Sequence, residues 1–315
     1  MHNRKCFENH IGPWAVWPQW FHEKLAGIKA GLVKPRAMED DGENAAERAR
    51  REDLAFKAAG ASKIVRDENF RLLYVVQDGV GVARIDGAMA KFDGKYTEAN
   101  TVRIRQAVRQ ASADPDVGAL VLRIDSPGGN VAGTAELAAD VKAAADAKPD
   151  KPVWAYIEDL GASAAYWVAS QADKIFANEM ALIGSIGTYA VVDDASKAYE
   201  MAGIKTHVIS TGPYKGSLIE GSEVLPEHLN EVREIVEGFN SHFLAAVSAG
   251  RGMDRKALGA VTDGRVWIAS EAKRLGLVDQ VTTWDAMFAD ARDRAGKKLN
   301  RSKQAEALTR LAEEI

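Results

Sequence analysis

Four short turns in this 315-residue sequence combine glycine with residues that can carry chemistry. Two of them, DSPGG (125–129) and GASAAY (161–166), each follow an apolar stretch of strand length. The third is GSIG (184–187), and the fourth is TGPYKG (211–216), which contains a lysine. Together they offer a hydroxyl nucleophile, an amine base and backbone N–H donors for a developing oxyanion. That combination is typical of acyl transfer through a serine.

Ser163 lies between small residues where a predicted strand gives way to a helix. Such a turn can present the hydroxyl at the helix N-terminus, with the N–H of Ala164 directed to the oxyanion. Gly128 and Gly129 let the backbone turn tightly and expose further N–H donors. Read alone, each turn also has a structural explanation. Pro-Gly is a common turn pair, Ser163 can cap a helix, and Ser185 can be a plain turn residue.

A serine hydroxyl hardly ionises near neutral pH, so it needs a base. Histidine is the usual base, but none of the six histidines in the sequence lies in a glycine-rich turn. A Ser–His–Asp triad is therefore possible, but no motif in the sequence indicates one. Lysine can replace histidine where burial keeps its amine neutral. Lys215 follows a predicted strand in such a turn, although a lone lysine is usually a solvated surface residue.

The bulk composition restricts the function. A formal net charge of -4 argues against non-specific binding to nucleic acid, and the single cysteine, Cys6, rules out a disulfide within the chain. The sequence has no apolar run long enough for a membrane anchor and no signal-peptide pattern at its start, so we expect a cytoplasmic protein acting on soluble substrates. Motifs for zinc, P-loop and dinucleotide binding are missing, so we expect no metal and no cofactor.

Strands and helices alternate from about residue 72 onward. The run at 119–125 is continuously apolar, as in a buried parallel strand. The alternation predicts βαβ units with right-handed crossovers, hence an α/β fold. We predict strands within 72–90 and at 119–125, 153–159, 174–178, 186–192 and 206–210, and helices at 97–112 (with Thr97 as a possible cap), 134–147, 194–202 and 226–249.

The two ends of the chain differ from this middle part. Trp14, Trp17 and Trp20 crowd the start, which predicts either a short helix at about 19–31 held by aromatic anchors or a surface for an assembly partner. The charged stretch 38–53 is either a solvated linker or an exposed helix. The last residues, 296–315, are polar and predicted to be helical. We therefore divide the chain into an extension with a charged linker (1–53), a catalytic α/β domain (70–290) and a polar helical tail (291–315).

In this order, the four motifs resemble the signal peptide peptidase A family, a Ser–Lys peptidase branch of the Clp/crotonase superfamily. The resemblance runs from about residue 80 to 283 and includes DGRVWIASEAKRLGLVDQV (263–281). It implies a Clp/crotonase-like fold of repeated βαβ units, here with a Trp-rich N-terminal extension and a helical tail. It also implies site roles: Ser163 as nucleophile, Lys215 as general base, Ser185 orienting that lysine, and the N–H of Gly128 or Gly129 together with that of Ala164 as the oxyanion hole.

Cellular members of this family usually begin with a membrane anchor, which this sequence lacks. Its opening instead resembles phage-type members, the lambda-like head-maturation proteases, which cleave scaffold and portal proteins inside the prohead. The resemblance implies protein or peptide substrates and a homo-oligomeric ring whose neighbouring subunits help enclose the active sites. Asn130 and Gly216 depart slightly from the usual turn composition.

Two other functions stay open. One is a crotonase-type acyl-CoA enzyme, which also uses N–H donors for an oxyanion but needs no Ser–Lys pair. The other is a non-catalytic assembly shell. The intact set of Ser163, Ser185 and Lys215 argues against the shell, because a shell has no need of it.

Overall fold

The computed structural model describes residues 14–16, 44–93, 98–147 and 150–313. Among these residues, nine strands form one large sheet and four short strands form a second one. The large sheet joins, in spatial order, β12 (Val266–Ile268), β11 (Leu182–Gly184), β9 (Val153–Ala162), β7 (Ala119–Ser126), β4 (Val80–Asp86), β3 (Leu72–Gln77) and β2 (Lys63–Arg66), with β10 (Lys174–Ala177) and β13 (Gln280–Val281) branching from β9.

The centre of the large sheet is parallel, and its two edges are antiparallel. The strand β7 pairs in parallel with both β4 and β9, and β9 pairs in parallel with β10 and β11. The helix α4 (Thr101–Ala113) connects β4 to β7, and α5 (Thr134–Ala147) connects β7 to β9. These are βαβ units, so the α/β class predicted from the alternating pattern is confirmed.

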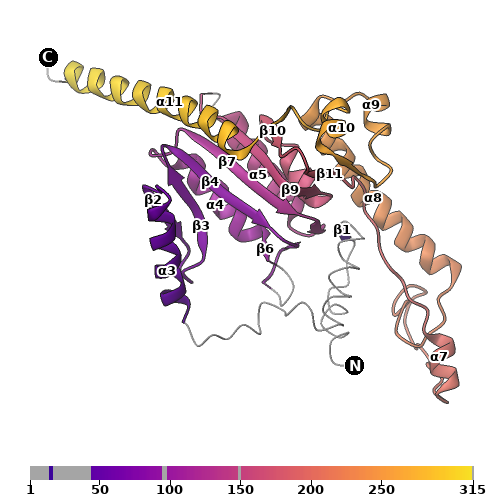
Figure 1. Ribbon diagram of the computed structural model, residues 1–315. Helices are drawn as coiled ribbons and strands as arrows, with labels where there is room; N and C mark the ends of the chain where they lie inside the picture. The colour runs from indigo at the N-terminus through magenta and orange to yellow at the C-terminus, as the bar shows by residue number, and fades with distance from the viewer. Residues whose placement is uncertain (1–13, 17–43, 94–97, 148–149, 314–315) are drawn as a thin grey trace.

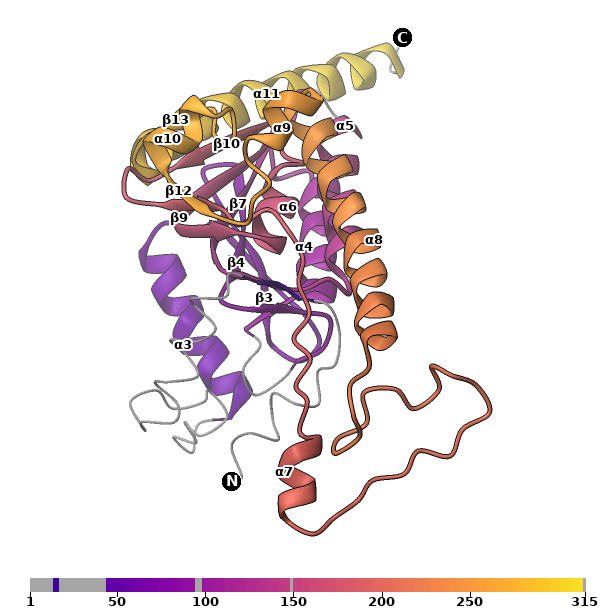
Figure 2. The ribbon, with the colours of Figure 1, turned by 90° about the vertical axis from the view of Figure 1, so that its right-hand side faces the viewer.

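Helices cover both faces of the large sheet (Figures 1 and 2). On one face, α4, α5 and α6 (Ala164–Ala169) bury a core that includes Val108, Leu137 and Tyr166, and α8 (Pro226–Arg251) adds Phe243. On the other face, α11 (Trp284–Glu313) packs its first half on the sheet and its second half extends past the sheet. This long helix confirms the predicted helical C-terminal end. Residues buried against the sheet on the α11 side include Trp154, Tyr156, Met287, Ala291 and Ala295.

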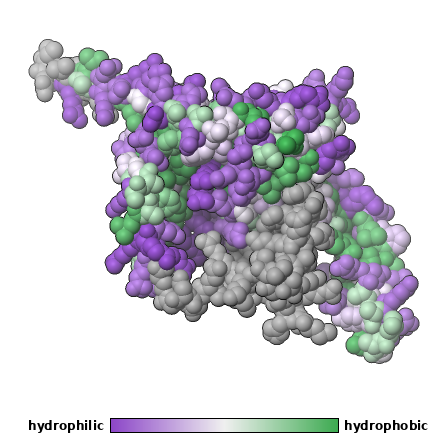
Figure 3. Space-filling view, viewed as in Figure 1, coloured by the Kyte–Doolittle hydropathy of each residue, from purple (hydrophilic) through white to green (hydrophobic). Residues whose placement is uncertain are grey.

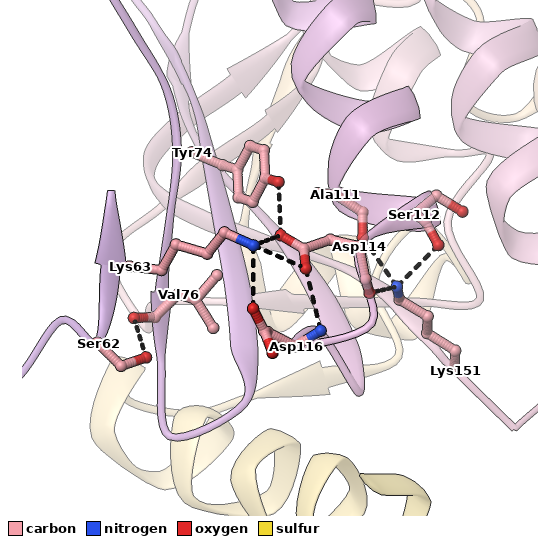
Figure 4. Close-up of polar contacts among 9 residues, drawn as sticks. All are labelled: Ser62, Lys63, Tyr74, Val76, Ala111, Ser112, Asp114, Asp116 and Lys151. Atoms are coloured by element: carbon pink, nitrogen blue, oxygen red, sulfur yellow. Dashed lines mark hydrogen bonds and ion pairs between the residues drawn. The ribbon is translucent and has the colours of Figure 1, made fainter. Parts of the chain in front are cut away.

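A polar network ties the end of α4 to the sheet (Figure 4). The buried Asp114 carboxylate accepts hydrogen bonds from Tyr74 Oη at 2.7 Å and from Lys63 Nζ at 3.0 Å. The Lys151 ammonium donates to the carbonyls of Ala111, Ser112 and Asp114, which lie at the C-terminus of α4. Carbonyls at a helix end lack partners within the helix and attract positive charge, so Lys151 caps α4.

The structure corrects two predicted strands, at 186–192 and 206–210. Both lie in an irregular segment, residues 186–225, which we call the arm. Its one helix is α7 (Ser196–Met201), and it extends away from the sheet in Figure 2. Residues 206–210 have strand-like alternation, but a strand needs a partner, and nothing in the described part of the chain pairs with them.

Smaller differences concern the N-terminal third. The helix predicted at 97–112 begins at Thr101, where the Asn100 side chain accepts from the N–H of Arg103. Within the charged stretch, α3 (Ala45–Ala58) is a helix with a capping box at Asn44. Cys6, the possible Thr97 cap and the helix predicted at 19–31 lie outside the described residues.

Candidate active site

Three of the four motifs meet at one edge of the large sheet. The DSPGG turn begins at the end of β7, Ser163 directly follows β9, and Ser185 directly follows β11. The registers place these strand ends side by side, because Ser126 pairs with Gly161 and Gly184 pairs with Ala162. Active sites of α/β proteins gather at the carboxyl ends of parallel strands. The sheet therefore brings together motifs that are up to 62 residues apart, from the start of DSPGG to the end of GSIG.

Ser163 has an unusual backbone conformation. Its φ is 55° and its ψ is -121°, a backbone region that residues other than glycine rarely adopt. A residue held there costs about 1–3 kcal/mol and points to a functional demand on the turn. The conformation is fixed by the N–H of Ser163, which donates to the Gly184 carbonyl at 2.7 Å. A serine on such a strained strand-to-helix turn is the geometry of a nucleophile elbow.

The Ser163 hydroxyl is buried but unused. The residue is 1% exposed, and its Oγ has no hydrogen-bond partner among the described residues. A buried hydroxyl without a partner is costly and calls for an explanation. Ala164 is the first residue of α6, so its N–H has no acceptor within that helix. A hydroxyl without a partner in the described part of the chain and an N–H without an intrahelical acceptor are the two groups that an acyl-transfer site needs next to each other.

The two glycines of DSPGG form the short strand β8 (Gly128–Asn130), which contacts α6. It belongs to the second sheet, in the order β1 (Trp14–Val16), β8, β5 (Met89–Ala90) and β6 (Ala99–Asn100). Gly128 has a φ of 89°, which favours glycine. At Gly129, an added Cβ would lie 1.9 Å from the Met89 carbonyl oxygen, so only glycine allows β5 to approach this closely.

Ser126 is a residue that the sequence reasoning missed. It is fully buried, and its Oγ donates to the Gly87 carbonyl at 2.6 Å while accepting from the Gly128 N–H at 3.2 Å. Its hydroxyl thereby fixes the glycine turn to the loop after β4. In this state the Gly128 N–H is already engaged. The signal was present in the sequence, as a serine between a buried strand and two glycines.

Ser185 is held as firmly as Ser163. It is buried, it has a φ of 50°, and its N–H donates to the Arg265 carbonyl at 2.7 Å. The preceding residue, Gly184, lies against Trp267, so β12 supports this turn from outside. Two serines at neighbouring strand ends thus share a backbone region that residues other than glycine rarely occupy.

Charge near the site comes from a group of carboxylates. Burial raises the pKa of the Asp125 carboxyl, and the negative charges of Asp159 and Glu158 raise it further. Glu158 is itself paired with Arg123 through a hydrogen bond of 2.7 Å. Within the described ranges, no group of three or more histidine, cysteine, aspartate or glutamate side chains is arranged to hold a metal ion.

Lys215 is the one predicted site residue that the structure does not bring to the others. It lies in the arm, and it is exposed, whereas Ser163 and Ser185 are buried. Its N–H donates to the Gly212 carbonyl at 3.2 Å, but no hydrogen bond joins its side chain to either serine in the described part of the molecule. In a single chain, therefore, the serine side of the candidate site is formed, and the Lys215 amine lies apart from it.

The sequence matches known proteases. Residues 145–298 match the family model for peptidase family S49. The chain is 30% identical over 223 residues to Protease 4 of Salmonella typhi, which covers 70% of this chain and 35% of that protein. It is 29% identical over 240 residues to Capsid assembly protease C of Escherichia phage lambda, covering 72% of this chain and 52% of that protein. The predicted resemblance to the signal peptide peptidase A family is thereby confirmed.

The chain spans about a third to a half of the length of these two relatives. Among solved structures, it is similar to an enoyl-CoA hydratase/isomerase family protein from Silicibacter pomeroyi, with 16% identity, a TM-score of 0.44 and coverage of 72% of this chain and 82% of that one. In the part of the chain that is described, no helix is both long and apolar enough to cross a membrane.

Proposed function

We propose that this chain, a relative of the family S49 peptidases, is a serine endopeptidase in which Ser163 is the nucleophile and Lys215 the general base. The observation that carries the proposal is the Ser163 turn. Its backbone is strained, and its buried hydroxyl has no partner among the described residues. It precedes the first N–H of α6, and α6 contacts the Gly128–Gly129 strand. A purely structural serine has no use for that combination.

The chemistry follows from these groups. A neutral Lys215 amine takes the proton of the Ser163 hydroxyl, and the oxygen attacks a peptide carbonyl. The oxyanion of the tetrahedral intermediate accepts from the N–H of Ala164 and from an N–H of Gly128 or Gly129. Lys215 then protonates the leaving amine, and water hydrolyses the acyl-enzyme. Ser185 orients the lysine through its hydroxyl.

The exposed position of Lys215 adds a requirement. A lysine amine stays protonated in water, and it becomes a base only where burial favours its neutral form. We propose that this burial occurs in a homo-oligomeric ring, in which the arm of one subunit reaches the Ser163 side of the next. The arm supports this proposal, because it leaves large apolar or aromatic side chains uncovered, and Figure 3 shows green surface where the arm extends at the lower right. These are Val191, Met201, Ile204, Val208, Ile209, Tyr214 and Ile219.

The substrates that we propose are extended protein segments. A peptide can pair with a strand edge beside the glycine turn, which presents its carbonyls in order to the nucleophile. The similarity to a capsid assembly protease supports phage scaffold or portal proteins as the natural substrates, cleaved within a prohead in the host cytoplasm.

Intact-mass measurement on full-length proteins incubated with unfolded casein tests the proposal. We expect the wild type to cleave casein, and Ser163→Ala and Lys215→Ala to fail. Ser241→Ala is the matched control, because Ser241 is exposed on α8 and bonds only to its own helix. Its activity should equal that of the wild type.

Two outcomes would contradict the assignment of roles. Undiminished cleavage by Ser163→Ala would refute Ser163 as the nucleophile. If Ser185→Ala were then inactive, the nucleophile would be the serine of GSIG, and Ser163 would have the supporting role.

A further inference from the structure

A short described segment near the start of the sequence, residues 14–16, lies on the candidate oxyanion strand β8. The strand β1 pairs antiparallel with β8, with Trp14 opposite Asn130, Ala15 opposite Gly129 and Val16 opposite Gly128. More than a hundred residues separate the two strands in the sequence. This contact is part of neither the large sheet nor the catalytic chemistry described above.

The strand β8 has two edges, and they are not equivalent. On one edge Gly129 pairs with Met89 of β5, so closely that no side chain fits between them. That edge is a fixed part of the fold. The other edge of β8 is occupied by β1 alone, within the described part of the chain. Removal of β1 would therefore expose one row of backbone donors and acceptors on β8.

An extended peptide that approaches this row would add to β8 as a strand. It would then run along the strand that carries Gly128 and Gly129 and that contacts α6, whose first residue follows Ser163. The same edge of β8 can thus pair with two extended segments. One is β1, which occupies it in the structure, and the other is the substrate peptide that the proposed reaction needs.

We infer that β1 is an internal competitor, which covers the substrate edge of β8 and must leave before a peptide can bind there. The part of this inference in which a substrate replaces β1 rests on the proposed peptidase function. Among the described residues the pairing spans three positions, and an isolated strand of that length is marginal. A short strand of this kind can be displaced, so it regulates access and does not block it permanently.

The test compares two full-length proteins that cannot cleave, Ser163→Ala and Ala15→Pro/Ser163→Ala. Proline at position 15 removes a backbone N–H and disfavours a ladder position. The probe is fluorescein-labelled unfolded β-casein, followed by fluorescence anisotropy. We expect Ala15→Pro to tighten casein binding about tenfold, as when a binding-competent state rises from about a tenth to most of the population. The control Ala15→Ser/Ser163→Ala keeps the N–H and should bind like Ser163→Ala.

A second measurement does not depend on catalysis. Amide hydrogen exchange of the segment 126–131 should be faster in Ala15→Pro/Ser163→Ala than in Ser163→Ala. A synthetic peptide with the sequence of residues 11–20, IGPWAVWPQW, should bind the proline variant and slow this exchange again. Unchanged exchange and no binding of this peptide would overturn the inference.

The two proposals fail in different ways. If the proline variant exposes β8 and binds the peptide, but the chain with an intact Ser163 never cleaves casein, the peptidase proposal fails and the competition for β8 stands. If the wild type cleaves casein and Ala15→Pro changes neither exchange nor binding, the peptidase proposal stands and the inference about β1 fails.

Discussion

Ser163 and Lys215 lie in opposite surroundings. Ser163 is 1% exposed, at the junction of β9 and α6, and its N–H is bonded to the neighbouring strand. Lys215 is exposed on an arm in which Ile209 is 99% and Met201 89% exposed. The Ser163 half of the candidate site is thus held by the core of the chain. The Lys215 half has no such support within the described part of the chain. Under the proposed roles, folding of one chain builds the nucleophile side of the site, and we propose that assembly brings the base to it.

The largest expected effect concerns that division. Lys215→Ala should lower casein cleavage by about a thousandfold or more, because the serine loses its base. If the base acts between subunits, then mixing Ser163→Ala with Lys215→Ala subunits in equal amounts should restore about a quarter of the wild-type activity, since that share of sites combines both intact residues. Activity is measured after the subunits have exchanged. No recovery would place Lys215 in the same chain as the serine it serves.

The next effect tests the folded body of the chain, away from the candidate site. Burial would raise the pKa of the Asp114 carboxyl, but the hydrogen bonds from Lys63, Tyr74 and the Asp116 N–H outweigh it and hold the pKa below its usual value. Asp114→Asn should therefore lower the free energy of unfolding by about 2 kcal/mol at pH 7. Urea unfolding measures this loss.

The dependence on pH has a definite sign. A carboxyl with a lowered folded-state pKa stabilises the protein fully above its unfolded-state pKa of about 4, and this contribution is lost as the pH falls below that value. The difference in the free energy of unfolding between the wild type and Asp114→Asn should therefore become smaller in acid. Asp116→Asn is the control, since its exposed carboxylate pairs with the same Lys63 and should cost less than about 0.5 kcal/mol. A gap that widened in acid would contradict the network described here.

A smaller effect isolates the backbone strain at Ser163. Glycine adopts a φ of 55° without the cost that alanine pays, so Ser163→Gly should be more stable than Ser163→Ala by about 1 kcal/mol. On the helix α8 the order should reverse, with Ser241→Gly less stable than Ser241→Ala by about 1 kcal/mol. Thermal unfolding of the four variants provides the comparison. Equal stability of the two Ser163 variants would show that the turn relaxes.

The smallest expected effect on folding lies in the arm. Ile209→Ser should change the free energy of unfolding of the single chain by less than about 0.5 kcal/mol, because the side chain contacts solvent. It should nevertheless weaken self-association, measured by sedimentation velocity. Leu308→Ser, on the exposed end of α11, is the matched control and should leave association unchanged. Unaltered association of Ile209→Ser would remove this residue from the subunit contact.

The sequence predicted best what depends on local pattern. The apolar run at β7, the alternation of strands and helices, and the glycine turns at strand ends all followed from rules that act within a few residues. Prediction failed where a partner distant in the sequence decides the conformation. Residues 206–210 alternate like a strand but pair with no strand in the described ranges of this chain. The pairing of β1 with β8 was missed for the same reason, although Trp14–Val16 between two prolines is a strand-like signal.

The helix α11 is anchored on the sheet at one end and projects from it at the other. Its Ala295 backbone rests directly on Gly118, where an added Cβ would lie 2.5 Å from the Ala295 carbonyl oxygen, and Leu299 reaches Gly79. Beyond that point the helix continues to Glu313, about 20 Å farther at 1.5 Å per residue. A fluorescent reporter or a surface tether attached there would therefore stand clear of the sheet, and it would report the orientation of the whole body without touching the site.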